Sequence, residues 1–195
     1  MQKPVVYEFI SLDGRFSGPE GHEMDWVQSD LTAEIEGDIA RQYEGVEAFI
    51  MGRTTFDSLA GYWPTPAASG ERLVGYMNER AKLVISSTEP NISAWPNSLH
   101  VVPDPVEHLR ERKTQSAGDL MVIGSGTVVR LLASAGLVDE FRFLLFPVLL
   151  GEGKQLFPES TNALAARFSQ TSIHQYSNGV VALHYSKPAS RSPRS

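Results

Sequence analysis

Two glycines stand where a short apolar run gives way to a helical pattern. The run Leu120–Ile123 predicts a buried strand, Gly124-Ser125-Gly126-Thr127 follow it, and Val128–Leu132 begin a helix. A helix that starts directly after a strand presents free backbone N–H groups and the positive end of its dipole, which suit a phosphate or pyrophosphate. Gly-x-Gly between a strand and a helix is also common as a plain tight turn. The motif therefore leaves a phosphate site and a simple turn both open.

Three other groups of small, hydroxyl or basic residues also follow predicted strands. They are Ser11-Leu12-Asp13-Gly14, Gly52-Arg53-Thr54-Thr55 and Ser86-Ser87-Thr88. In an open α/β sheet, ligands bind beyond the carboxyl ends of the strands, so these groups are expected at one edge together with the glycine loop. Gly52 permits close approach of a ligand, while the two threonines and Arg53 supply hydroxyls and a fixed charge. For residues 52–55 the competing interpretation is a capped helix with a solvated arginine. For residues 86–88 it is a simple turn after the strand.

Candidates for proton transfer and for substrate contacts lie in the first third of the chain. Asp13 follows the first strand and Asp25 precedes an aromatic residue, and either could assist protonation if desolvation raised its pKa. Surface-loop acids more often stay solvated or cap turns. Trp26 and Trp63 could line a substrate cleft, with packing in the core as the alternative.

Composition excludes several classes of function. The net charge is −6 without a block of Lys or Arg, which argues against nucleic acid and anionic membranes as partners. The chain has no cysteine, so disulfides, thiolate metal sites and cysteine nucleophiles are absent, and a reducing cytoplasm is the expected location. Its 5 histidines show no ligand spacing, so no metal site is expected. The chain has no apolar run of about 18 residues, so no membrane span is expected. The first residues lack the apolar core of a signal peptide, so none is expected. The sequence has no nucleophile elbow, which argues against a hydrolase.

Strands and helices alternate through the first two-thirds of the chain. Strands are predicted at 5–12, 48–51, 82–86, 100–102 and 120–123, and helices at about 30–43, 54–59, 72–79, 106–112 and 127–135. Ser29 or Asp30 could cap the first helix, and Gly136 gives the last one a natural stop.

The pattern becomes antiparallel near the end. Strands are predicted at 141–150, 167–175 and 180–186, and Asn178-Gly179 between the last two is a strong hairpin signal. The predicted fold class is α/β: a mostly parallel mixed sheet flanked by helices, with an antiparallel C-terminal hairpin. Residues 1–186 are expected to form one domain, and the Pro- and Ser-rich residues 187–195 a loosely held tail.

Five segments together carry a family resemblance. SLDG at 11–14, MGRTTFDSL at 51–59, LVISST at 83–88 and VIGSGT at 122–127 occur in the order and spacing of the dihydrofolate reductase-like superfamily. The later GLVDEF at 136–141, followed by FPVLLGEGKQLF at 146–157, resembles the branch that contains the C-terminal reductase domain of the riboflavin-biosynthesis deaminase/reductase and its stand-alone relatives. The resemblance extends from about residue 5 to residue 186.

The resemblance implies an NADPH-dependent reductase that transfers hydride to a C=N or C=O bond of a pterin-like or pyrimidine-like substrate. In it Gly124-Ser125-Gly126-Thr127 would hold the pyrophosphate, and Gly52, Arg53, Thr54 and Thr55 would contact phosphate and ribose groups. Ser86 and Ser87 would lie near the adenosine end. Relatives in this branch are commonly homodimers, and the apolar stretch 141–150 could join such an interface.

Two departures from the family pattern bear on the site. Relatives commonly carry two adjacent glycines where this chain has Gly124-Ser125, and many carry an arginine where it has Ser87. Recognition of a 2′-phosphate would therefore depend on Arg53 and the hydroxyls. Dihydrofolate reductases carry a substrate-binding acid on their first helix, and residues 20–26 offer several carboxylates but no clean match to it. A non-catalytic dinucleotide- or small-molecule-binding module on the same fold is therefore the competing hypothesis.

Overall fold

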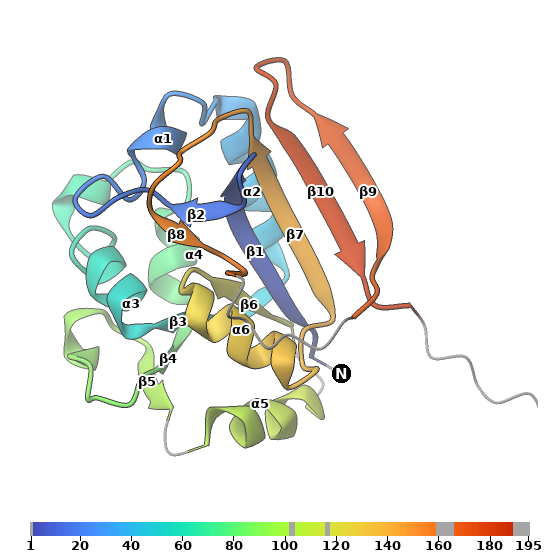
Figure 1. The fold of residues 1–195 in the computed structure, drawn as a ribbon. Helices are drawn as coiled ribbons and strands as arrows, with labels where there is room; N and C mark the ends of the chain where they lie inside the picture. Colours follow the sequence, from blue (N-terminus) through green and yellow to red (C-terminus); the bar gives the residue numbers. More distant parts are fainter. Residues whose placement is uncertain (1, 102–103, 116–117, 159–165, 189–195) are drawn as a thin grey trace, which may run out of the picture.

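A computed structural model describes residues 2–101, 104–115, 118–158 and 166–188 (Figure 1). Eight strands form one sheet in the order β5-β4-β3-β6-β1-β7-β10-β9. These strands are β1 (Pro4–Ser11), β3 (Val46–Gly52), β4 (Ala81–Ile85), β5 (Ser98–Val101), β6 (Asp119–Ile123), β7 (Glu140–Phe146), β9 (Ser169–Gln175) and β10 (Val181–Ser186). The helices are α1 (Asp25–Gln28), α2 (Ala33–Glu44), α3 (Arg53–Ala60), α4 (Val74–Glu79), α5 (Pro105–Lys113) and α6 (Gly126–Ser134), with 3-10 turns η1 (Pro66–Ala68) and η2 (Ile92–Ala94).

The sheet is parallel from β5 to β7 and antiparallel beyond it. β1 pairs in parallel with both β6 and β7, whereas β10 runs antiparallel to β7 and to β9. Figure 1 shows α6 and α2 on opposite faces of the sheet, with β9 and β10 extending past the helices. The predicted fold class is confirmed, including the C-terminal hairpin, whose turn contains Gly179 with a φ of 89°.

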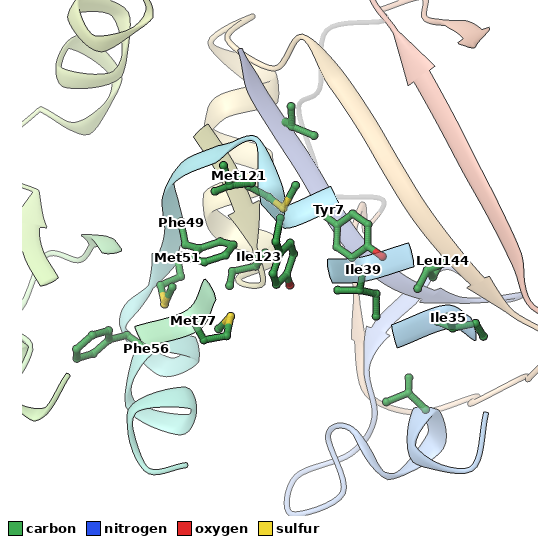
Figure 2. Close-up of a cluster of buried hydrophobic side chains, with 14 of the residues drawn as sticks. Tyr7, Ile35, Ile39, Phe49, Met51, Phe56, Met77, Met121, Ile123 and Leu144 are labelled. Carbon is green, nitrogen blue, oxygen red and sulfur yellow. The ribbon is translucent and has the colours of Figure 1, made fainter. Parts of the chain in front are cut away.

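Each face of the sheet is covered by its own apolar cluster, because alternate residues of a strand point to opposite faces. On the α2 face, Tyr7 and Phe49 pack with Ile35 and Ile39 of the helix (Figure 2). On the α6 face, Val6 packs with the buried side chains of that helix. β1 is thus buried from both sides, so a polar residue within it is enclosed by protein.

The ends of several elements differ from the sequence-based expectation. α2 starts at Ala33 and is capped by Thr32, whose hydroxyl accepts a hydrogen bond from Ile35 N (3.4 Å), so the predicted caps at Ser29 and Asp30 were wrong. β7 ends at Phe146, because the proline that follows cannot donate to a sheet. The short antiparallel pair β2 (Arg15–Ser17) and β8 (Lys154–Gln155) was not predicted, since neither strand is long enough to show a period.

The chain after β10 is only partly described. Lys187 N donates a hydrogen bond to Asp139 O (2.9 Å), which anchors the first residue of the predicted tail. From residue 189 onward, the predicted tail lies outside the described residues. Within the described ranges, no helix has the length and apolar character needed to cross a membrane.

Candidate functional site

The four polar segments that follow predicted strands do meet at one edge of the sheet. β4, β3, β6 and β1 are successive neighbours, and all four run parallel. Gly52 is paired with Ile85, so the segments after β3 and β4 leave the sheet side by side. Ile123, the last residue of β6, is paired with Tyr7, while β1 continues beside β7 to Ser11 before its own polar segment begins. The expected convergence is confirmed.

The two glycine-containing loops pack directly on each other. A Cβ built on Gly52 would lie 2.8 Å from Cβ of Ser125, and one built on Gly124 would lie 2.7 Å from Cγ2 of Thr55. Both distances are shorter than ordinary van der Waals contact, so a larger residue at either position would displace the facing side chain. The loops after β3 and β6 therefore form one surface.

The turn between β6 and α6 uses two successive left-handed residues. Gly124 has a φ of 79°, and Ser125 has a φ of 68° with a ψ of 89°. This conformation costs an L-residue about 1–2 kcal/mol and persists where the surrounding structure enforces it. Ser125 thus adopts a left-handed conformation that glycine takes without steric cost.

The helices that begin at this edge have no side-chain caps. α2 and α5 are capped by Thr32 and Asp104, whereas α3 and α6 begin after Gly52 and Ser125 without a side-chain acceptor. In the described part of the chain, the backbone N–H groups of Ser125, Gly126 and Thr127 donate no hydrogen bond. Unpaired N–H groups at two adjacent helix N-termini are the donors that a pyrophosphate site uses, while Gly126 itself is buried beside the Phe16 ring.

Hydroxyl and basic side chains surround these open N–H groups. Arg53 and Thr54 are exposed on the first turn of α3. Thr127 is exposed on the first turn of α6, and Arg130 Nη2 lies 3.3 Å from its hydroxyl. Ser86 and Ser87 follow β4, where Ser86 Oγ accepts a hydrogen bond from Thr88 N (3.1 Å) and closes a turn. The predicted cofactor residues lie on one continuous edge.

Asp13 has a structural role in this arrangement. Its carboxylate accepts hydrogen bonds from the Ser11 hydroxyl (2.7 Å) and from Arg15 Nε (2.9 Å). It also accepts from the backbone N–H groups of Leu150 (3.1 Å) and Gly151 (2.9 Å). These bonds, that of Ser11 first, hold the pKa of Asp13 well below its ordinary value. A carboxylate held ionised in this way is unsuited to donating a proton, which argues against the role predicted for Asp13.

The other predicted substrate-side residues lie on α1 and in the segment that follows α3. Asp25 is exposed on α1, and its carboxylate pairs with His22 Nδ1 (2.7 Å). Trp26 stacks edge-on against Phe146 and donates its indole N–H to Glu23 O (2.8 Å). Trp63 is half-buried after α3, and its carbonyl accepts a hydrogen bond from Asn78 Nδ2 (2.9 Å). Both tryptophans pack against the α2-face cluster, as the alternative interpretation expected.

Glu8 is a functional candidate that the sequence analysis missed. It lies on β1, is only 5% exposed, and its Oε1 accepts a hydrogen bond from Gly124 N (3.0 Å). Burial raises the pKa of Glu8 to about 8, and the Gly124 bond offsets only part of this effect. The signal that could have found it is a single carboxylate inside the apolar strand PVVYEFIS.

A cavity of about 180 Å³, lined by both polar and apolar side chains, opens on the α2 face between that helix and strands β9 and β10. Tyr7 lines it from β1, His174 and Tyr176 line it from the C-terminal hairpin region, and Arg41 lines it from α2. Within the described residues the Tyr7 hydroxyl makes no hydrogen bond, although the residue is only 5% exposed. None of the predicted site residues lines this cavity.

Comparison with known proteins identifies the family. The sequence profile of the RibD C-terminal domain matches residues 5–182, which is most of the chain. The chain belongs to the RibD C-terminal domain family. It is 28% identical to the uncharacterized protein YyaP of Bacillus subtilis over 187 residues, which cover 94% of this chain and 95% of YyaP.

Solved structures share the fold of this RibD C-terminal domain. A Shewanella sp. PV-4 protein that is named for riboflavin biosynthesis aligns with a TM-score of 0.75 and 21% identity, over 96% of this chain and 100% of that one. A pyrimidine reductase-like protein from Corynebacterium diphtheriae aligns with a TM-score of 0.63 and 13% identity, over 95% and 91%. The resemblance to the dihydrofolate reductase-like superfamily is confirmed, and the fold is reductase-like.

Proposed function

We propose that the protein is an NADPH-dependent reductase of a small pterin-like or pyrimidine-like heterocycle. The observation that carries the proposal is the joined surface of the two glycine loops, where α3 and α6 begin without side-chain caps. Membership of the RibD C-terminal domain family supports the same assignment. A dinucleotide bound there would supply the hydride, while the protein supplies binding, orientation and electrostatics.

The residues at this edge divide the binding of the dinucleotide between them. In the loop Gly124-Ser125-Gly126-Thr127, the N–H groups of the last three residues would hold the pyrophosphate, because that of Gly124 is already bonded to Glu8. Thr54 and Thr55 would add hydroxyl contacts. Arg53 would recognise the 2′-phosphate, because it is an exposed guanidinium on the first turn of α3. Ser86 and Ser87, at the end of neighbouring β4, would face the adenosine end.

The cavity on the α2 face is the proposed substrate site. Tyr7 lines this cavity and is paired in the sheet with Ile123, the residue just before the glycine loop. A cavity of about 150 Å³ holds a benzene-sized ring, so 180 Å³ suits a single small heterocycle. Tyr7 and His184 offer hydrogen bonds to ring nitrogens or carbonyls, and burial lowers the pKa of His184, which keeps its imidazole neutral.

One observation favours the competing binding-module function. The acid nearest to the end of β1, Asp13, is committed to four hydrogen bonds that fix a turn. A protein with the same fold could thus hold a dinucleotide without a placed proton donor.

Titration with NADPH and NADH, followed by fluorescence, tests the assignment. We expect NADPH to bind with a Kd below millimolar, and the nicotinamide absorbance to fall when a pterin or pyrimidine substrate is added. Failure of both nucleotides to bind at millimolar concentration would overturn the reductase and the dinucleotide-binding module together. Binding without oxidation by any member of the substrate panel would favour the module.

We further propose that the protein forms a homodimer through β9. This strand is the end of the sheet, all of its residues are exposed, and Ile173 is 62% exposed. It contains no proline, lysine or glutamate of the kind that protects a free strand edge. β7, by contrast, is paired on both sides, so the predicted interface stretch 141–150 has no free edge along its strand.

A further inference from the structure

The carboxyl group of Glu8 lies directly beneath the loop that joins β6 to α6. Glu8 shares a face of β1 with Val6 and Ile10, which pack in the α6-face cluster. From there its Oε1 accepts the hydrogen bond of Gly124 N at 3.0 Å. Gly124 is the first of the two left-handed residues, so this bond holds the loop at the point where it leaves the sheet.

No cation compensates the Glu8 carboxylate. Gly124 N–H is the one hydrogen-bond partner that the described chain gives it, and no ion pair to it is found there. Arg142 of neighbouring β7 bonds Gln42 of α2, which places its guanidinium on the opposite face of the sheet. Arg130 of α6 donates to Leu156 O (2.9 Å), away from Glu8.

The other titratable group near Glu8 is the Tyr43 hydroxyl of α2. Burial raises the pKa of Tyr43, and the charge of Glu8 raises it further, so this side chain stays neutral and offers Glu8 no charge. β6 contributes Asp119, which lies at the opposite end of its strand from Gly124. Glu8 is therefore a buried acid surrounded by neutral groups and placed under a site built for anions.

We propose that Glu8 is a positioning residue of the dinucleotide seat: its neutral carboxyl group holds Gly124, and its ionised form weakens the binding of a phosphate-bearing ligand on the loop above. The proposal rests on the proposed function, because it takes the loop to be a pyrophosphate site. A neutral carboxyl group leaves the open N–H groups of Ser125, Gly126 and Thr127 as the uncompensated positive charge of the loop. An ionised one places a negative charge in a low-dielectric interior beside the bound phosphates.

The ordinary conditions of the cell favour the neutral form. Burial raises the pKa of Glu8 to about 8, so the group is mostly protonated at pH 7 and loses its proton as the pH rises further. Binding of an anion above the loop would raise this pKa again, because it disfavours the charged form. Proton uptake and ligand binding are thus coupled at one side chain.

The first test measures the Kd of NADPH by fluorescence between pH 6.5 and 9.5. We expect the wild-type protein to lose about tenfold in affinity between pH 7 and pH 9. Glu8→Gln keeps an oxygen for Gly124 N–H and cannot ionise, so its affinity should match the wild type at pH 7 and stay constant above it. Glu8→Ala removes the bond and should weaken binding at every pH. An equal fall with pH in the wild type and in Glu8→Gln overturns the proposal.

A second test reads the protonation of Glu8 without any nucleotide. The infrared spectrum of the unliganded protein at pH 7 should contain a protonated-carboxyl band that Glu8→Gln lacks. Urea unfolding of the variant checks that it folds. If the band is missing while NADPH binds, Glu8 is ionised and the inference fails, but the reductase proposal stands. If the band is present and no nucleotide binds, the proposed function has failed and the inference fails with it.

Discussion

The side chain of Ser125 occupies the space that a side chain on Gly52 would need. A Cβ built on Gly52 lies 2.8 Å from Ser125 Cβ, although the two residues are on loops that follow different strands. Their contact joins the N-termini of α3 and α6 into one surface. The geometry of the proposed cofactor site therefore depends on a pair of residues and not on either motif alone.

Substitution of Gly52 tests this dependence. We expect Gly52→Ala to destabilise the protein by about 1–3 kcal/mol, since the added methyl group must displace Ser125. NADPH binding should weaken as well. In the double variant Gly52→Ala/Ser125→Gly the clash is removed, so both losses should be largely reversed. Urea unfolding and nucleotide titration measure the two effects.

Gly45→Ala is the matched control for that series. No atom lies within 4 Å of a Cβ built on Gly45, and its φ of −85° suits any residue. Its free energy of unfolding should stay within about 0.5 kcal/mol of the wild type. If the double variant is as unstable as Gly52→Ala, the contact with Ser125 is not the cause of the destabilisation by Gly52→Ala.

Arg53 should distinguish NADPH from NADH. We expect Arg53→Ala to raise the Kd of NADPH by about tenfold, a loss of about 1.4 kcal/mol, and to leave that of NADH nearly unchanged. The reason is that only NADPH carries the 2′-phosphate. Arg110→Ala, at an exposed position of α5, serves as the charge-matched control. Equal weakening of both nucleotides by Arg53→Ala would show that Arg53 is not the 2′-phosphate contact.

Asp13 should contribute to stability and not to proton transfer. Its pKa is lower in the folded protein than in the unfolded chain, so the carboxylate stabilises the fold above its ordinary pKa of 3.8. This contribution is lost as the pH falls toward the lowered value. Asp13→Asn should melt at a lower temperature than the wild type at pH 7, and the difference should shrink from pH 4 downward.

Asp25→Asn provides the comparison, because this carboxyl is exposed and, among the residues that the structure describes, hydrogen-bonds to His22 alone. Its melting temperature should be close to that of the wild type. If Asp13→Asn melts like the wild type at pH 7, the four hydrogen bonds do not stabilise the turn.

Lys82 should make stability rise with pH on the alkaline side. This side chain is fully buried on β4, donates to Met77 O (3.3 Å) and Asn78 O (3.1 Å), and lies 4.7 Å from the centre of the Trp95 ring. Burial lowers its pKa from 10.5 to about 8. Between these values the unfolded chain binds more protons than the folded protein, so the free energy of unfolding increases with pH.

Lys82→Met should remove that increase. We expect the wild type to gain about 1 kcal/mol or more relative to this variant between pH 7 and pH 10, measured by urea unfolding. Lys3→Met, at an exposed position, should follow the wild type over the same range. Parallel pH profiles of the wild type and Lys82→Met would contradict the expectation.

Ile173 tests the proposed dimer. Ile173→Lys places a charge on the free edge strand and should convert a dimer into a monomer, as measured by light scattering after size-exclusion chromatography. Leu149→Lys is the control. The Leu149 side chain is also well exposed, at 72%, but it follows β7 and is not part of β9. A mass that stays dimeric in Ile173→Lys would exclude β9 as the interface.

The sequence by itself determined the order of the elements and the edge at which the chemistry gathers. Periodicity is a local property, so the alternation of strands and helices, the hairpin at Gly179 and the glycine loop at 124–127 could be predicted from neighbouring residues. Because parallel strands place their carboxyl ends at one edge, the convergence of the four polar segments followed from the same information.

Only the tertiary structure decided what individual polar side chains do there. Asp13 bonds to Leu150 and Gly151, which lie 137 and 138 residues away in sequence, and Glu8 bonds to Gly124, which lies 116 residues away. Burial and long-range hydrogen bonds set the charge of a carboxyl group, and neither is encoded in the residues beside it. For that reason the sequence pointed to Asp13 as an acid, while the fold made Asp13 a fixed carboxylate and Glu8 the buried acid.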